Sequence, residues 1–328
     1  MLQKLLEDWE GAQALLTDQT HYSESAFEEI MTQAVFYQKL AQVYDFKTPV
    51  QVLKAYGFEY AQLQSEVWIK ANLTDTHIRA LHLLKVPKGS QRIMMEIAYD
   101  GTLFEGFQRQ ASSVRTVQGE LESALSHLHP EVITLHPASR TDKGVHAQGQ
   151  RIQFDTHQPH TKEQYLNILA KLLPRDIQLQ EVTFVPSVFH VRYDVWMKTY
   201  HYRLSQNPPI TRVHQVYRTH HPDLETINKR LAVFVGTHDF ANFAKLKGVY
   251  TTVRTLTVAK AYHDNEDVIV EIQGRGFARY MVRMLVGAVL RYDEAQLTQA
   301  LNEPTKPIAK HLAPAHGLTL HNIQYRQA

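Results

Sequence analysis

The sequence predicts a mixed α/β or α+β body preceded by a helical segment. After Ser90, segments with strand-like and helix-like hydrophobic patterns alternate to the end of the chain. This alternation is typical of a sheet with helices packed on one face. Before that point, apolar residues recur at helical spacing instead. The stretch Pro87-Lys88-Gly89-Ser90 has the composition of a linker. We therefore predict two units, a helical extension over 1–88 and a body over 89–328.

The extension carries start and stop signals for helices. Residues 25–43 have apolar positions near helical spacing, and Ser25 with a glutamate three residues later fits a capping box. Thr48-Pro49 suits the start of a second helix, with proline at its first position, and Gly57 punctuates its end. A third helix is predicted after Thr74.

The strands of the body are predicted from runs rich in β-branched and aromatic residues. The first run, 92–99, is ended by Asp100-Gly101. The aromatic run 191–204 is long enough for one strand or two. A short polar stretch between 253–262 and 267–273 predicts a hairpin. In chain order the predicted strands are 92–99, 150–154, 177–185, 191–204, 253–262 and 267–273.

The helices predicted between these strands are 116–128, 162–173, 223–235 and 278–292. The last one is strongly apolar apart from Arg283. A charge in such a helix destabilises it unless it finds a partner. Two interpretations stand: Arg283 reaches solvent at the edge of the helix, or it pairs with an acidic group elsewhere in the chain.

Composition excludes several classes of chemistry. The chain of 328 residues contains no cysteine, which excludes disulfides, thiolate metal sites and a cysteine nucleophile. Its 19 histidines are dispersed and include no HExxH spacing, so we expect no metal site. No apolar run reaches the length of a membrane span. The N-terminus is acidic and lacks the pattern of a secretory signal, so we expect a cytoplasmic protein.

The formal net charge of +2 hides an asymmetry. Residues 1–90 hold 8 basic and 11 acidic side chains, a net charge of −3. Subtracting these from the totals of 35 and 33 leaves 27 basic and 22 acidic side chains in the rest, a net of +5. A basic body with an acidic appendage points weakly to a polyanion as the partner of the body. An uneven but ordinary solvated surface explains the same numbers.

The densest signal for function is the segment SRTDKGVHA at 139–147. It places Asp142 between basic residues and next to a glycine. Neighbouring positive charge favours an ionised carboxylate, which a nucleophile requires. Asp is also common in ordinary surface turns, where it caps the backbone. The residues alone leave both interpretations open.

Several segments together resemble the TruA-type tRNA pseudouridine synthases. SRTDKGVHA is similar to the GRTDxGVHA signature of that family, and the other segments follow in family order. The resemblance runs from about Arg92 to Tyr325. The matching segments are YDGTLFEGFQRQ (99–110), RTVQGELESAL (115–125), FHVRYDVWMKTYHYRL (189–204), GTHDFANF (236–243), GRGFARYMVRMLVGAVL (274–290) and APAHGLTL (313–320).

The resemblance implies an α+β pseudouridine synthase fold, with two similar ferredoxin-like halves forming one continuous antiparallel sheet flanked by helices. The halves would span about 92–190 and 191–325. Family members act as homodimers and convert uridine to pseudouridine in the anticodon stem-loop of tRNA, at positions 38–40. They cleave the glycosidic bond, rotate the base and rejoin it through carbon, with no cofactor or metal.

The resemblance also assigns roles to residues. Asp142 matches the catalytic aspartate, and Arg140 the arginine that helps to hold the flipped nucleotide. Tyr200 matches the active-site tyrosine, which could stack on uracil. Tyr202, two residues further along a strand, shares its face and is the fallback. Arg283 matches the arginine that faces the catalytic aspartate.

Further residues of the matched segments are candidates for contacts with RNA. Each of the cations could equally be an ordinary solvated side chain, because phosphate contacts are generic. Four positions depart from the family pattern, namely Ser139, Lys143, Tyr280 and Thr319. The candidate contacts are Arg109, Lys143, Lys245, Lys247, Arg275, Phe277 and Arg279.

Rival functions remain at this point. A catalytically inactive tRNA-binding protein would keep the fold, although Asp142, Tyr200 and Arg283 are all present. An aspartate-dependent nuclease or glycosidase would need a second catalytic carboxylate or clustered metal-binding acids, and 139–147 offers none. For the extension 1–88 two hypotheses stand: it contacts an unidentified protein, or it is a unit with a second function.

Overall fold

The computed structural model describes residues 89–111, 114–186, 189–245, 252–303 and 311–325. The helices predicted within 1–88 lie outside these residues. The described part combines helices with one large sheet, as predicted. Within it, no helix has both the length and the apolar character that crossing a membrane demands.

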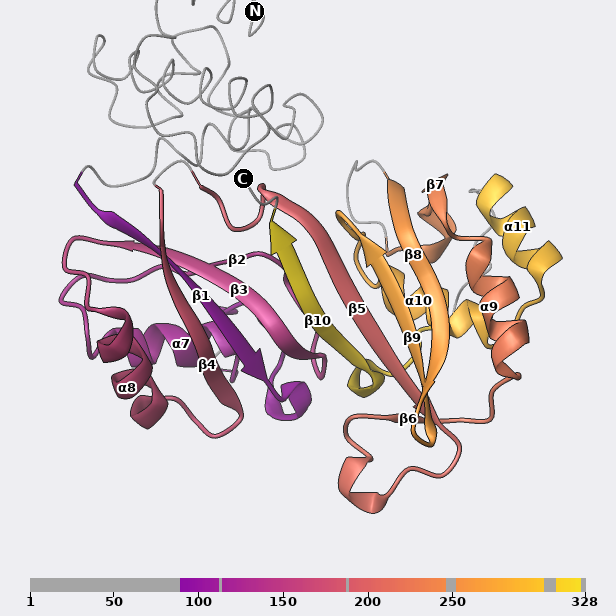
Figure 1. Cartoon of the computed structure of the whole chain (residues 1–328), viewed down its shortest axis with the longest axis horizontal. Coiled ribbons are helices and arrows are strands. Elements are labelled where there is room, and N and C mark those ends of the chain that lie inside the picture. The colour runs from indigo at the N-terminus through magenta and orange to yellow at the C-terminus, as the bar shows by residue number, and fades with distance from the viewer. Residues whose placement is uncertain (1–88, 112–113, 187–188, 246–251, 304–310, 326–328) are drawn as a thin grey trace, which may run out of the picture.

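A ten-stranded sheet forms the centre of the body, in the order β4-β1-β3-β10-β5-β9-β8-β7 (Figure 1). Two short strands join it at the side, β2 on β3 and β6 on β5. The strands are β1 Gln91–Tyr99, β2 His136–Pro137, β3 His146–Thr156, β4 Ile177–Val185, β5 Val195–Ser205, β6 Tyr217–Arg218, β7 Gly236–Asp239, β8 Val253–Asp264, β9 Asp267–Gly274 and β10 Leu318–Tyr325.

The sheet is mostly antiparallel, and two of its strand pairs are parallel. The last strand, β10, lies between β3 and β5. It pairs antiparallel with β5 but parallel with β3, through Thr319 opposite His146 and Leu320 opposite Ala147. The short β5–β6 pair is parallel as well. The C-terminal strand thus joins the two sides of the sheet.

Alternating burial explains why these segments form strands. Along β1, Ile93, Met95 and Ile97 are at most 1% exposed, while the residues between them are partly exposed. Along β5, Tyr200, Tyr202 and Leu204 follow the same alternation. Because side chains alternate across a strand, one face of the sheet carries the apolar core.

The helices gather in two groups at opposite ends of the sheet (Figure 1). One group contacts β4 through α8, and the other contacts β8 and β7 through α9 and α11. Capping side chains start four of the helices, which satisfies backbone amides that would otherwise lack acceptors. The helices are α7 Val117–Leu125, α8 Lys162–Leu172, α9 Leu224–Ala232, α10 Met281–Val289 and α11 Glu294–Asn302.

Most predicted elements of the body are present. The strand 177–185 matches β4 residue for residue, and 191–204 is one strand that begins at Val195. The helix predicted over 278–292 begins only at Met281, because Tyr280 before it has a left-handed backbone. The sequence patterns did not predict β7, β10 or α11.

Candidate active site

Asp142 lies in the turn that connects β2 to β3. The turn rests on the segment after β1. The Phe107 amide donates to the Thr141 carbonyl at 3.1 Å, and the Gly144 amide to the Phe104 carbonyl at 3.4 Å. Gly106 has φ +101°, and a Cβ there would stand 3.1 Å from the Thr141 carbonyl oxygen. Glycine therefore permits the close approach that holds the turn in place.

A buried polar network fixes the residues just before Asp142. Gln150 of β3 donates to the Ser139 carbonyl at 2.6 Å and accepts from the Ser139 amide at 3.2 Å. The Tyr99 hydroxyl lies 2.8 Å from the Thr141 hydroxyl. Gln150 is fully buried, so losing either partner would leave polar groups unsatisfied. The network gives the carboxylate a rigid support.

The structure brings Arg283 and Asp142 together, although they are far apart in the sequence. One guanidinium nitrogen of Arg283 lies 3.6 Å from Asp142 Oδ2, and the two side chains are 11% and 27% exposed. The Arg283 Nε donates to the Ala313 carbonyl at 2.7 Å, which aims the guanidinium group. Arg283 thus has a partner in the turn rather than lying at the surface.

Burial raises the pKa of Asp142 above its ordinary value, while Arg283 and Arg279 oppose this by favouring the charged form. The sequence suggested that nearby cations would decide the charge of this carboxylate. In the folded protein desolvation outweighs them. Contacts that bring further positive charge close would lower this pKa.

Tyr200 projects from β5 towards the same turn. Its hydroxyl lies 2.9 Å from the Ser139 hydroxyl, and its ring meets the Phe277 ring edge-on with centroids 5.1 Å apart. Burial raises the pKa of Tyr200 to about 12, so the hydroxyl stays protonated near neutral pH. The ring is only 6% exposed. Phe277, which is half-buried, offers more ring surface for a base.

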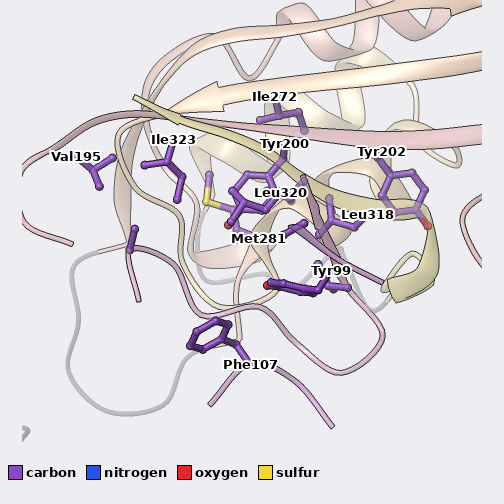
Figure 2. Close-up of a cluster of buried hydrophobic side chains, with 14 of the residues drawn as sticks. Tyr99, Phe107, Val195, Tyr200, Tyr202, Ile272, Met281, Leu318, Leu320 and Ile323 are labelled. Atoms are coloured by element: carbon purple, nitrogen blue, oxygen red, sulfur yellow. The ribbon is translucent and has the colours of Figure 1, made fainter. Parts of the chain in front are cut away.

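Tyr202 occupies the core beside the site. Figure 2 shows Tyr200 and Tyr202 in one cluster with Leu318 and Leu320. Tyr202 has no exposed surface, and its hydroxyl donates to the Pro314 carbonyl at 2.7 Å. This side chain connects β5 to the C-terminal segment and presents no ring face to a ligand.

The cations predicted to contact RNA differ in their partners. Arg109 lies 3.0 Å from the Glu122 carboxylate, and Lys143 is paired with Glu105. By contrast, Arg279 and Lys245 are exposed cations beside the ring of Tyr280. Lys247 lies outside the described residues. Arg140 and Arg275 are exposed.

Sequence reasoning missed two residues that position the turn. Gln150 is a polar residue on the buried face of a strand, which is a recognisable signal. Lys198 is also buried, and its ammonium group donates to the Ala138 carbonyl at 2.8 Å. Burial lowers the pKa of Lys198 to about 7. A lysine two residues before Tyr200 on the buried face of a strand could have been flagged in the same way.

Within the described residues, no three side chains of His, Asp or Glu gather as a metal site would require. What the arrangement offers is one carboxylate on a rigid turn, an arginine beside it and two aromatic rings. In such a site the carboxylate could act as a general acid or base or as a nucleophile towards a planar ligand.

Most of the body is similar in sequence to known proteins. The family model described as tRNA pseudouridine synthase matches residues 95–194 and 231–326. The tRNA pseudouridine synthase A of Anoxybacillus flavithermus is 39% identical over 247 residues, which cover 72% of this chain and 99% of the relative. The protein of that name from Exiguobacterium sp. is 34% identical over 244 residues, covering 72% and 99%. The tRNA pseudouridine synthase A 1 of Desulfotalea psychrophila is 36% identical over 252 residues, covering 72% and 100%. The chain therefore belongs to the tRNA pseudouridine synthase family.

Proposed function

We propose that this protein isomerises uridine to pseudouridine in the anticodon stem-loop of tRNA, at positions 38–40, with Asp142 as the catalytic residue. The observation that carries the proposal is the Asp142–Arg283 pair at 3.6 Å, on a turn fixed by buried hydrogen bonds. The reaction cleaves the glycosidic bond, rotates the uracil and rejoins it through C5. The composition does not change, because C5 loses one proton and N1 gains one.

The site assigns separate tasks to its residues. Asp142 attacks the nucleotide or assists departure of the base, and Arg283 stabilises its charged form. A uridine within a stem must first be flipped out of its stack. Arg140, exposed and two residues before Asp142, would hold the flipped conformation. Tyr200 and Phe277 form an aromatic wall against which the uracil would rest.

Basic side chains around the site would contact the RNA backbone. Arg279 and Lys245 are the stronger candidates, because Arg109 and Lys143 already have carboxylate partners. Tyr202 is the weakest, since it is fully buried. The net charge of +5 over residues 91–328 favours a polyanionic partner. Because tRNA is the substrate, we place the enzyme in the cytoplasm.

The domain organisation belongs to the same proposal. The body, residues 89–328, would comprise two similar ferredoxin-like halves over about 92–190 and 191–325. The division of helices into two groups at the ends of one sheet supports this (Figure 1). We further propose that the enzyme acts as a homodimer, and that residues 1–88 form a helical unit that contacts a further protein.

The test uses the full chain and a tRNA transcript labelled with tritium at uridine C5. Isomerisation releases the label, because C5 becomes the atom bonded to ribose. We expect release by the wild type without added metal or cofactor, and none by Asp142→Asn. Filter binding should show that this variant still binds the tRNA. Binding without release by either protein would instead identify an inactive tRNA-binding protein.

A further inference from the structure

Three cations surround the ring of Tyr280. The guanidinium carbons of Arg279 and Arg283 lie 4.9 and 5.6 Å from the ring centroid, and the ammonium nitrogen of Lys245 lies 5.8 Å from it. These distances are within the range of cation–π attraction. A guanidinium nitrogen of Arg279 is also 3.2 Å from the Tyr280 hydroxyl oxygen, to which it donates.

The backbone of Tyr280 is unusual. Its φ of +63° is left-handed, a conformation that side chains with a Cβ rarely adopt. In the described residues, the other residue of this kind is Asn265, in the β8–β9 hairpin, where asparagine is well suited. Tyr280 precedes α10 but makes no side-chain capping bond. No capping bond from its side chain therefore explains the conformation, and such strain is commonly found at functional sites.

The left-handed residue lies between two arginines that both act on Asp142. Arg279 precedes it, and Arg283 follows in the first turn of α10. Both favour the charged form of the Asp142 carboxylate. The Lys245 amide also donates to the Arg279 carbonyl at 3.0 Å, which ties the third cation to the same segment.

Like charges gathered at one place repel each other unless something offsets the repulsion. A carboxylate would do so, but it would also repel Asp142 and the phosphates of an RNA. Among the described residues, no carboxylate lies within the 4.0 Å of a salt bridge from Arg279 or Lys245. The negative face of an aromatic ring attracts cations while carrying no net charge.

We propose that Tyr280 is a positioning residue for the isomerisation, whose ring holds Arg283 and Arg279 beside Asp142, and Lys245 next to Arg279, before RNA binds. This role rests on the proposed function. Arg283 is thereby kept beside the carboxylate, and the two exposed cations are kept available for phosphates.

The role predicts a change in how activity depends on pH. The charged and titratable groups around Asp142 are Arg279 and Arg283 from the β9–α10 segment, Tyr200 from β5, and Arg140 and Lys143 of its own turn, with Lys143 paired to Glu105. Removing the ring would loosen the two arginines. The carboxylate would then ionise at higher pH, because less positive charge supports its charged form.

The decisive variants are Tyr280→Gly and Tyr280→Phe, made in the full chain. Glycine adopts the left-handed backbone without strain but removes the ring. We expect kcat/KM for tritium release to fall about tenfold, with the acid limb of its pH profile moved to higher pH. Phenylalanine keeps the ring and should lose no more than about threefold. Asn265→Gly is the matched control, since it changes the other left-handed position far from these cations.

Two results would overturn the role of Tyr280: a glycine variant with wild-type kcat/KM and an unmoved acid limb, or a phenylalanine variant as defective as glycine. If Tyr280→Gly lacks a cooperative unfolding transition, Tyr280→Asn replaces it, because asparagine tolerates the same backbone. Absence of tritium release by the wild type itself would refute the proposed function, which is a different outcome.

Discussion

Asp142 lies in a turn that is held by hydrogen bonds from β3 and from the segment after β1. Its partner Arg283 lies three residues after Tyr280, whose backbone is left-handed, and donates to the Ala313 carbonyl. The support of Asp142 is buried and polar, with Gln150 at its centre. The support of Arg283 is an aromatic ring shared with two exposed cations. The carboxylate is thus positioned by buried hydrogen bonds, whereas the arginine is positioned by one backbone carbonyl and an aromatic ring.

The largest effect should come from breaking the contact between the two sides. Arg283→Met keeps the volume of the side chain but leaves Asp142 without its nearest cation. We expect kcat/KM for tritium release to fall about a hundredfold, the order seen when one electrostatic partner is removed from an active site. The acid limb of the profile should also move to higher pH. Arg283→Lys, which keeps a charge, should recover part of the activity, and an intact rate in Arg283→Met would refute the pairing as catalytic.

A second variant tests the support of Asp142 alone. Gln150→Leu removes the bonds to both the amide and the carbonyl of Ser139 with little change in size. We expect the free energy of unfolding in urea to fall by about 2–3 kcal/mol, because buried polar groups lose their partners. Tyr99→Phe, a second variant in the same network, should lose about 1 kcal/mol, since it removes one hydroxyl that pairs with Thr141 and leaves both bonds between Gln150 and Ser139 in place. Equal stability of Gln150→Leu and wild type would mean that the network does not hold the turn.

The smallest effect distinguishes cations on the ring from cations paired with carboxylates. Removing a cation that binds one phosphate should reduce the slope of log affinity against log salt by about 0.7–0.9. We expect this reduction for Arg279→Gln and for Lys245→Gln in tRNA binding. Arg109→Gln and Lys143→Gln should change the slope less, because Glu122 and Glu105 already neutralise these side chains. The reverse order would contradict our ranking of the RNA contacts.

Much of the fold was predictable because it depends on local pattern. The strand β4 and the start of α8 agree with prediction because the residue types that favour a strand or a helix lie within a few residues of each other in the chain. The strand β10 was not predicted, since its place between β3 and β5 depends on pairing with strands distant in sequence. Similarly, α11 was missed despite its capping box at Asp293.

The residues of the site also fall into those that the sequence predicted and those that only the structure identified. Asp142, Tyr200, Phe277 and Arg283 were found through motifs, and the structure brings them into one region. Tyr280 was noticed only as a departure from the family pattern. Its left-handed backbone could not be predicted, because tyrosine has no preference for that conformation. Gln150 and Lys198 acquire their roles from neighbours that only the sheet supplies.

By itself the sequence determined which carboxylate stands in the matched motif and which arginine and aromatic residues accompany it. Only the tertiary structure decided that burial outweighs the nearby cations in setting the pKa of Asp142, because desolvation depends on everything packed around a group. It also decided which cations have carboxylate partners. Those pairings join residues that are distant along the chain, and the order of strands in the sheet determines which of them meet.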